Sequence, residues 1–516
     1  MTTTVTGRMA SGATGHDGFA RVVHAEWTKF RTVRGWVIAM IVAIGAIMAV
    51  PLLSHYTCMH SRSGCPTVIG PGGEAVQDAY FFAHQPLTGN GTITAQITSL
   101  TAQYDNGQPT MLPGGLQPWS KAGIIIKENT SQGSAYAAMM ATGSNGVRMQ
   151  WNYVNDTPGL AGSVSASSPR WLRLARDGDT ITGYDSADGT HWTLVGTVTL
   201  TGLTSTVQAG LFAATPALQG ASTIGSGTGT SAGFSAPVLA TGTFQHVGLS
   251  WPATGWAGTQ MGGVGPHGTS MAGSYRDSAG TFTVSGSGDI APGSPNGASS
   301  LWNALQGVFL GLIALVVVGA MFITAEYRRG LIRVSLTASP RRGRLLAAKV
   351  VVIGAVSFVT GLLAAALAVT VGGHALTAGG NSLLPIPALT EVRMVVGTAL
   401  LLAVAAVLAL AIGTIVRRSA VAVATVIVLV FVPYLFVIIP GIISQGTADW
   451  LLRLTPTAAF SIQQPFPAYP QVSAPSTYVP TSGYYPLSPW AGFAVECAWA
   501  AAALALAFYL LRSRDA

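Results

Sequence analysis

The stretch that decides the fold is Glu326-Tyr-Arg-Arg-Gly-Leu-Ile-Arg-Val-Ser-Leu-Thr-Ala-Ser-Pro-Arg-Arg-Gly-Arg-Leu-Leu-Ala-Ala-Lys349. It holds seven basic residues and one acidic residue, and it lies between two apolar runs that are each long enough to cross a bilayer. Short connectors rich in Lys and Arg face the cytoplasm in membrane proteins. The stretch therefore predicts a polytopic α-helical membrane protein with a cytoplasmic loop at residues 325–347.

The composition is that of a chain solvated largely by lipid. Of its 516 residues, 49% are hydrophobic and 9% are charged, whereas soluble domains carry about 25% charged residues. Residues 54–300 hold 11 acids and 8 bases, a net charge of −3, and the remainder holds 7 acids and 18 bases, a net charge of +11. Because the basic charge belongs to the apolar part, we expect lipid head groups and a cytoplasmic protein as partners, and no nucleic acid.

Six apolar segments approach the ~20 residues needed to span ~30 Å of hydrocarbon. The first begins at residue 36 and is followed by no small-residue cleavage site, so we interpret it as a retained span rather than a signal peptide. The six segments are residues 36–53, 302–324, 348–372, 394–416, 420–441 and 490–511.

The positions of Lys and Arg predict the orientation of these spans. With the N-terminus inside, 16 of the 18 bases outside residues 54–300 fall at the inner face or its boundary. Only Arg393 and Arg453 fall on the other side. This asymmetry predicts a multi-pass protein of the cell (plasma) membrane with both termini cytoplasmic, and with residues 54–300 and 442–489 extracytoplasmic.

Residues 1–35 form the expected cytoplasmic N-terminus, and the segment from Phe19 to Arg34 has the pattern of an amphipathic helix. Val22, Val23, Trp27 and Phe30 fall on one helical face, which suits a helix lying in the membrane interface. A simple flanking anchor for the first span, at 36–53, is the alternative. The N-terminal residues expected at the interface are Glu26, Trp27, Lys29, Arg31 and Arg34.

Three cysteines are too few for a disulfide scaffold. Cys58 and Cys65 follow the first span, where an oxidising side of the membrane would permit a disulfide between them; two free thiols are the alternative. Cys497 lies in the sixth apolar run and is expected to serve packing. The neighbouring Glu496 is an acid inside that run, and such residues are functional candidates by default; a structural hydrogen bond or a side chain reaching the interface is the alternative.

Residues 54–300 carry a different pattern, in which short runs alternate apolar and polar residues between turn signals. The segment from Arg170 to Val195 contains two Asp-Gly pairs, at 177–178 and 188–189, that predict a three-stranded meander. At least six such runs without a helical period predict an all-β sandwich inserted between the first and second spans. The remaining part, residues 301–516, holds the other five spans.

Four segments carry a resemblance of this insert to a known fold. They are Trp119-Ser-Lys-Ala-Gly-Ile-Ile-Ile-Lys, Trp171-Leu-Arg-Leu-Ala-Arg-Asp-Gly, Tyr184-Asp-Ser-Ala-Asp-Gly-Thr-His-Trp and Val207-Gln-Ala-Gly-Leu. Their pattern resembles the concanavalin-A-like lectin/glucanase jelly roll over about residues 75–240. Glycosidase chemistry requires two paired carboxylates, and the two glutamates of the insert, Glu74 and Glu128, lie outside any glucanase motif.

The membrane part resembles the permease subunits of bacterial type-2 ABC exporters. The resemblance rests on Thr324-Ala-Glu-Tyr-Arg-Arg-Gly-Leu-Ile-Arg, on Ser339-Pro-Arg-Arg-Gly-Arg and on Ala25-Glu-Trp-Thr-Lys-Phe-Arg-Thr-Val-Arg34. It implies that the loop contacts a soluble ATPase, and the alternatives for its charges are a local ion pair of Glu326 and lipid anchoring of the arginines. The residues implied in coupling are Glu326, Tyr327, Arg328, Arg329, Gly330, Arg333, Arg341 and Arg342.

The expected function is that of the membrane-spanning subunit of an ATP-driven exporter. None of the four lysines follows a glycine, so the chain holds no Walker A phosphate loop. We therefore expect no enzyme activity, metal or cofactor on this chain, and we expect ATP and Mg on a partner ATPase, with a second copy or a homologous permease completing the pathway.

The alternative function is a membrane-anchored protein that binds or senses carbohydrate or cell wall through the sandwich. A glycan ligand would need aromatic stacking faces. The tryptophans available for that role are Trp119, Trp151, Trp171 and Trp192.

Overall fold

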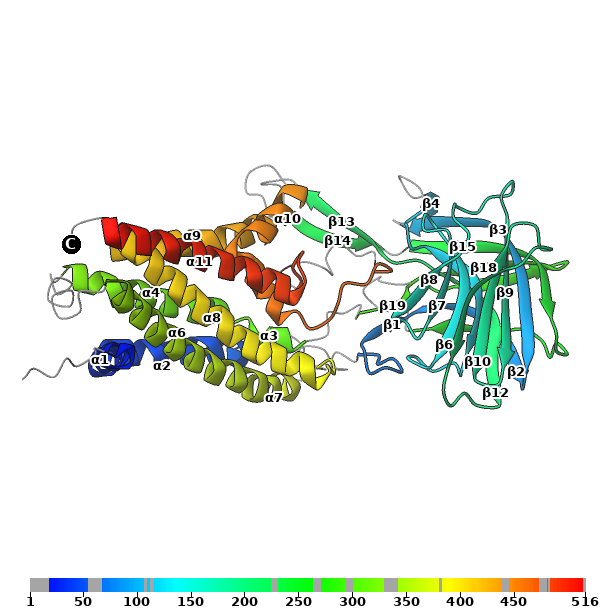
Figure 1. Cartoon of the computed structure of the whole chain (residues 1–516). Helices are drawn as coiled ribbons and strands as arrows, with labels where there is room; N and C mark the ends of the chain where they lie inside the picture. The colour runs from blue at the N-terminus through cyan, green and yellow to red at the C-terminus, as the bar shows by residue number, and fades with distance from the viewer. Residues whose placement is uncertain are drawn as a thin grey trace, which may run out of the picture.

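Two parts of different secondary structure lie end to end in the molecule (Figure 1). The long helices form a bundle at one end, and most strands gather at the other, while the β13–β14 pair reaches back to α10; all strands lie between α2 and α3 in the chain. The protein is thus a helical bundle with an all-β part inserted after its first long helix. The computed structural model describes residues 18–53, 67–105, 109–111, 116–223, 231–236, 238–262, 271–293, 300–328, 342–379, 383–438, 445–472, 480 and 483–513.

Among the residues that the structure describes, six helices are long and apolar enough to cross a membrane, which agrees with the number of spans predicted. The third of them continues through a π-helical turn into a short helix. The helices are α1 (Phe19–Thr32), α2 (Arg34–Leu53), α3 (Leu301–Leu305), α4 (Val308–Arg328), α6 (Arg342–Leu367), η2 (Ala368–Gly372), α7 (Gly373–Ala378), α8 (Ala388–Val416), α9 (Ser419–Ile438), α10 (Gln445–Leu454), η3 (Pro456–Gln463) and α11 (Pro489–Ser513).

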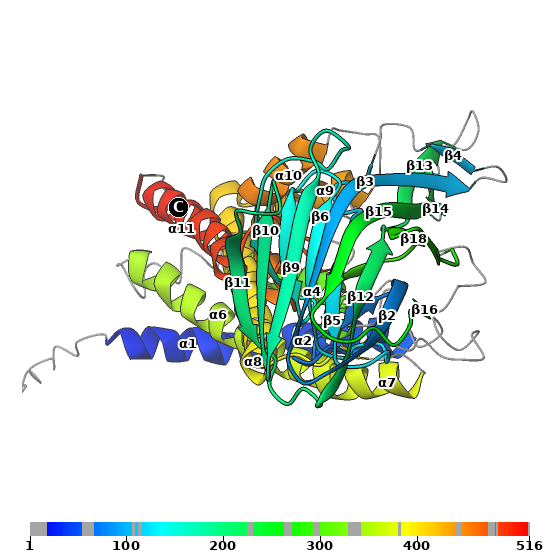
Figure 2. The same cartoon turned by 90° about the vertical axis from the view of Figure 1, so that its right-hand side faces the viewer.

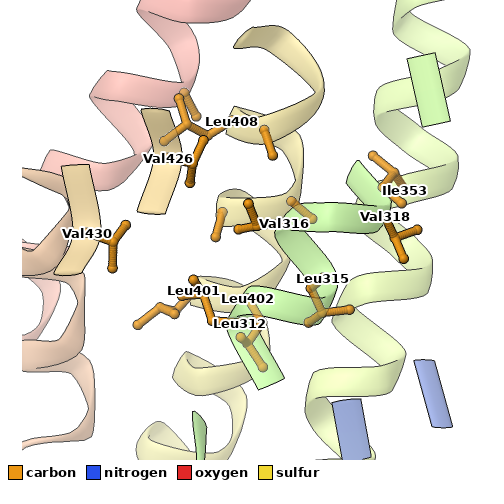
Figure 3. Packing of buried hydrophobic residues seen from close by; sticks show 14 of the residues in the cluster. Leu312, Leu315, Val316, Val318, Ile353, Leu401, Leu402, Leu408, Val426 and Val430 are labelled. Atoms are coloured by element: carbon orange, nitrogen blue, oxygen red, sulfur yellow. The ribbon is translucent and has the colours of Figure 1, made fainter. Parts of the chain in front are cut away.

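Helix α8 is the centre of the bundle. Its spanning window is 72% buried, against 22% for each of α2, α9 and α11, and it packs on α4, α6, α9 and α11. Figure 3 shows Leu401, Leu402 and Leu408 of α8 among apolar side chains of α4, α6 and α9. Because lipid tails are as apolar as leucine, close packing has to hold such helices together. A Cβ on Gly319 of α4 would lie 2.3 Å from the carbonyl oxygen of Ala406 in α8, so glycine is what permits this approach.

The segment between α9 and α11 contains a buried helix that its sequence does not predict. Residues 442–489 are too polar to span, and they include the short helix α10, which contains Trp450. The next helix, η3, is buried over its whole length and packs on α8 and α11. Its polar groups find partners there: Gln463 Nε2 donates to Thr398 Oγ1 at 3.0 Å, and Thr457 Oγ1 donates to the carbonyl of Val430 at 2.6 Å.

The β part is a sandwich of two antiparallel sheets (Figure 2). One has the order β11-β10-β9-β3-β15-β18-β17, with β4 paired to β3, and the other has the order β16-β2-β12-β5-β6-β7-β8. Apolar residues on alternate positions of both sheets form the core between them. The strands are β1 (Val76–Asp78), β2 (Tyr80–Thr88), β3 (Gly91–Asp105), β4 (Pro109–Met111), β5 (Lys121–Lys127), β6 (Tyr136–Thr142), β7 (Val147–Trp151), β8 (Asn155–Pro158), β9 (Arg170–Asp177), β10 (Thr180–Ser186), β11 (Thr193–Thr199), β12 (Thr206–Ala214), β13 (Leu218–Thr223), β14 (Ser231–Ala236), β15 (Val238–Leu249), β16 (Ala257–Met261), β17 (Ser274–Ser278), β18 (Thr281–Gly286) and β19 (Ile290–Pro292).

The predicted meander is present as β9, β10 and β11, which pair in that order. Gly178 and Gly189 of the two Asp-Gly pairs adopt φ of 60° and 77°, the left-handed conformation that such turns require. The sandwich extends further than the expected range of about 75–240, because β15 to β18 belong to its two sheets. Their Gly-, Ser- and Thr-rich sequences obscured the alternation of apolar and polar residues. Strand β15 nevertheless lies in the middle of its sheet, between β3 and β18.

The amphipathic helix expected near the N-terminus is α1, and the residues that it buries against the bundle are Phe30 and Glu26. Phe30 is 3% exposed, as expected of the apolar face, whereas Trp27 is 42% exposed. Glu26 is 1% exposed instead. Glu26 is buried because Lys29 and Lys349 pair with its carboxylate.

Candidate functional site

Helix α1 lies at the end of the bundle far from the sandwich, where the C-terminus also lies (Figure 1). It packs on α6 and α2. Aromatic contacts fix its C-terminal half: the ring of Phe30 lies 6.0 Å from that of Phe322 in α4 and 5.7 Å from that of Trp36 in α2. Helices α1 and α4, which are distant in sequence, are thus joined beside the start of α2.

Four charged side chains meet beneath these rings, and we call them the four-charge cluster: Glu26, Lys29, Glu326 and Lys349. Lys349 Nζ donates to Glu26 Oε2 at 2.6 Å and to Glu326 Oε1 at 2.8 Å. Lys29 Nζ donates to Glu26 Oε1 at 2.6 Å and to Glu326 Oε1 at 3.1 Å. Two acids and two bases alternate in space, so the charge of the cluster is balanced.

The cluster is largely shielded from water. Lys349 is fully buried, Glu26 is 1% exposed and Glu326 is 8% exposed, and the ammonium of Lys349 lies 4.6 Å from the ring centre of Phe322. A buried charge is costly unless it is paired and hydrogen-bonded. The ion pairs of the four-charge cluster are therefore needed for α1, α4 and α6 to pack together at this place.

Lys29 is the member that retains contact with solvent, since 40% of its side chain is exposed. Burial lowers its pKa, but the hydrogen bonds and negative charges of Glu26 and Glu326 outweigh this, so the pKa of Lys29 lies above its usual value. Glu326 Oε2 is buried and has no hydrogen-bond partner among the described residues.

The four-charge cluster includes a residue near each end of the connection between α4 and α6. Glu326 lies two residues before the end of α4, and Lys349 lies in the second turn of α6, which begins at Arg342. Their ion pair therefore ties together the two ends of the connection on which the sequence prediction rested. Glu26 and Lys29, one helical turn apart, tie the same place to α1.

The other residues predicted for the cytoplasmic face lie outside the four-charge cluster. Arg342 donates to the carbonyl of Leu511 at 2.9 Å and so contacts α11, and Tyr327 lies under the guanidinium of Arg417 at 5.1 Å. Exposed residues of the set are Trp27, Arg31, Arg34 and Arg328. Outside the described residues lie Arg329, Gly330, Arg333, Arg341, Cys58 and Cys65.

Glu496 stands apart from the cluster, inside α11. It is 1% exposed, and its Oε2 has no hydrogen-bond partner among the described residues. One turn before it, a Cβ on Gly492 would lie 2.2 Å from the carbonyl oxygen of Ala458, so this side of α11 lies against η3. The structure thus places Glu496 in the bundle interior, away from the four-charge cluster.

The four tryptophans predicted to be available for stacking on a glycan have few uncovered ring faces. Trp119 is 6% exposed, and Trp151 packs against the core. A Cβ on Gly189 would lie 2.7 Å from the ring of Trp171, whose ring centre is 5.3 Å from that of His246. Trp192 has the guanidinium of Arg173 at 3.8 Å from its ring centre.

The sequence prediction missed the partners of Glu326. The sequence predicts only a local ion pair for Glu326, whereas its partners are Lys29 and Lys349. The available signal was a single lysine in an otherwise apolar helix, which demands a buried acid nearby. No group of three metal-ligating side chains occurs among the residues that the structure describes.

Comparisons with known proteins give one family. The family described as "ABC-2 family transporter protein" matches residues 93–516, most of the chain. A comparison with curated proteins gave no match.

The solved structures that are similar to this chain align with low TM-scores. Scytalido-glutamic peptidase bound to a transition-state analogue inhibitor is 9% identical, and the alignment covers 40% of this chain and 98% of that chain with a TM-score of 0.24. A functionally unknown protein from Saccharomyces cerevisiae is 12% identical, with 37% and 95% covered and a TM-score of 0.19. A mutant GH43 protein from Bacillus licheniformis is 15% identical, with 24% of each chain covered and a TM-score of 0.17. Scores of this size carry no argument about fold or activity.

Proposed function

The chain belongs to the ABC-2 family of transporter proteins and is a multi-pass membrane permease; from this premise we propose that it couples to a separate ATPase through the four-charge cluster and the adjoining loop. The observation that carries the proposal is the set of ion pairs from Lys349 to Glu26 and Glu326. They bind both ends of the basic loop to the N-terminal helix. A force on the loop is then delivered to α1, α4 and α6 together.

The energy source is assigned to another polypeptide because this sequence has no phosphate-binding loop. A Walker A motif requires a lysine directly after a glycine, and none of Lys29, Lys121, Lys127 and Lys349 has that neighbour. ATP and Mg would bind the partner. The basic loop at residues 329–341, with three arginines, offers charge complementarity to an acidic docking surface on that partner.

The proposed orientation places the four-charge cluster and both termini in the cytoplasm and the sandwich outside the cell. Support comes from the distribution of Lys and Arg over the short connections. The end of the bundle that carries α1 is also the end that carries the C-terminus (Figure 1). An ATPase in the cytoplasm would then meet the loop directly.

A second permease, either another copy or a homologue, would complete the pathway. Helices α2, α9 and α11 are the least buried of the spans, so they offer apolar surface to lipid and to that second subunit. Transport would follow from rigid tilting of the two bundles when the ATPases close. In this scheme the cluster keeps the three helices from sliding past one another.

For the sandwich, we propose the concanavalin-A-like class of jelly roll, supported by its two antiparallel sheets and the strand motifs of the sequence. This class assignment concerns fold and carries no activity with it.

The test is a reconstitution of the full chain with its ATPase in nanodiscs. The unmodified permease should co-purify with the ATPase and raise its ATP hydrolysis. Glu326→Gln should retain membrane insertion and lose most of this stimulation, because the carboxylate shared by Lys29 and Lys349 is gone. The matched control is Glu391→Gln at the opposite end of the bundle, in the first turn of α8. Equal stimulation by both variants would refute the role of the cluster in coupling.

A further inference from the structure

The central strands of one sheet of the sandwich are buried on both faces. All seven residues of β5 and all seven of β6 are buried. One face of this sheet packs on the other sheet. On the opposite face, Phe82, Ile125 and Phe212 pack against Val76 of β1 and Ile290 of β19. The chain itself therefore covers the face that an open sandwich would offer to a ligand.

The covering strands are the chain's connections to the helices. Strand β1 follows the segment that leaves α2, and β19 precedes the segment that enters α3, and the two pair with each other. Both lie on the side of the sandwich that faces the bundle (Figure 1). Any relative motion of the two parts must act on these strands.

Each connecting segment is fixed to β5 by a buried ion pair. Lys127 Nζ donates to Asp78 Oδ2 at 2.9 Å, and Lys121 Nζ donates to Asp289 Oδ1 at 2.6 Å. Both lysines are fully buried. Since they are six residues apart on one strand, they point to the same face. The entrance and the exit of the sandwich are thus held by one central strand.

Tyr153 extends this network toward the membrane part. Its hydroxyl donates to Asp78 Oδ2 at 2.7 Å and receives a hydrogen bond from Lys127 at 2.9 Å. Its backbone has φ of 66°, and that of Asn152 has φ of 45°. Two successive non-glycine residues in the left-handed region are unfavourable and persist only where surrounding contacts impose them.

The contact that reaches the helices comes from Gln471. Its Nε2 donates to the carbonyl of Val154 at 3.0 Å and to that of Tyr153 at 3.3 Å. Gln471 is 1% exposed, and it belongs to the segment between η3 and α11. A continuous path therefore runs from the membrane part through Gln471 and Tyr153 to Asp78 and Lys127.

We propose that this sheet face is an intramolecular docking surface, in which Gln471 and the strained turn at Tyr153 hold the sandwich and the segment after η3 as one rigid body. This inference goes beyond transport coupling at the other end of the bundle. It means that a displacement of η3 and the segment that follows it reorients the sandwich. It also means that the covered face serves the chain's own membrane part rather than an external ligand.

The test measures the distance distribution between two nitroxide labels in the full chain, in nanodiscs near neutral pH. Ser278 in β17 and Gly446 in α10 are exposed labelling positions, with the three native cysteines replaced. The test variant is Gln471→Glu, an isosteric change that presents a carboxylate to two carbonyl oxygens. The matched control is Gln208→Glu in β12, where Oε1 contacts His84 at 2.7 Å, remote from Gln471.

The parent and the control should give one narrow population, and Gln471→Glu should lose it in favour of a broad distribution. If that variant fails to fold, Gln471→Asn, whose amide is one methylene short of the two carbonyls, should show the same loss. An unchanged narrow population in the folded Gln471 variant would overturn the proposal.

Discussion

The substitution Lys349→Met is the sharpest perturbation of the four-charge cluster. Methionine keeps the length and apolar volume of the side chain but removes the ammonium that Glu26 and Glu326 share at 2.6 and 2.8 Å. Two buried carboxylates would then depend on Lys29 alone, whose side chain is 40% exposed. Breaking a buried ion pair by removing one partner costs about 3–5 kcal/mol, which is on the order of a hundred- to several-thousand-fold in the folding equilibrium.

The assay is chemical unfolding of the detergent-solubilised chain, followed by tryptophan fluorescence. Lys29→Met is the matched control, and its loss should be about 1 kcal/mol or less, because solvent screens exposed pairs. The double variant Lys349→Met with Glu26→Gln should recover part of the loss, since Lys29 and Glu326 remain as a balanced pair. If Lys349→Met and Lys29→Met were equally destabilising, the assignment of Lys349 as the buried centre of the cluster would be wrong.

Three further predictions concern the sandwich and the bundle. Tyr153→Phe should destabilise the sandwich by about 1–3 kcal/mol in chemical unfolding because Asp78 and Lys127 lose a partner, whereas Tyr136→Phe should be near neutral, since that buried hydroxyl has no partner among the described residues; equal effects would refute this. Burial lowers the pKa of His84 below 6.5, so the stability it contributes is complete above pH 6.5 and is lost as the pH falls through its folded pKa; His84→Gln should flatten this part of a pH–stability profile, and an unchanged slope would contradict the assignment. Gly319→Ala should lower the Tm of the bundle because its Cβ would meet backbone at 2.3 Å, whereas Gly354→Ala, with its nearest neighbour at 3.6 Å, should be tolerated, and similar Tm values would argue against the α4–α8 contact.

The spans and the meander were predictable because their signals are local. A run of about 20 apolar residues needs no knowledge of its neighbours to be identified as a span. The Asp-Gly pair ending at Gly178 likewise demands a turn wherever it occurs, since glycine tolerates positive φ at no steric cost. These features depend on period and on backbone preference alone.

The four-charge cluster was not predictable because its members are far apart in the chain. Lys349 pairs with Glu26 across 323 positions, and a single sequence holds no signal for that distance. The same reason explains why the burial of Glu26 was not predicted, since its partner Lys349 lies on α6. Tertiary pairing decided which face was buried.

The burial of η3 and the extent of the sandwich were missed for a different reason. The sequence of η3, Pro-Thr-Ala-Ala-Phe-Ser-Ile-Gln, is short and partly polar, so neither length nor hydropathy marks it. Its polar groups are satisfied by α8 and α9, which permits burial. Strand β15 mixes glycines and threonines with its apolar residues, and its pairing with β3 and β18 identifies it.

The measurement that tests the central claim most directly is ATP hydrolysis by the partner ATPase in nanodiscs that contain the full chain, its Glu326→Gln variant or its Glu391→Gln variant. The account predicts stimulation by the parent and by Glu391→Gln, with most of it lost in Glu326→Gln although the variant still inserts. Full stimulation by Glu326→Gln, or an ATPase that neither binds nor responds to the parent chain, would contradict the account.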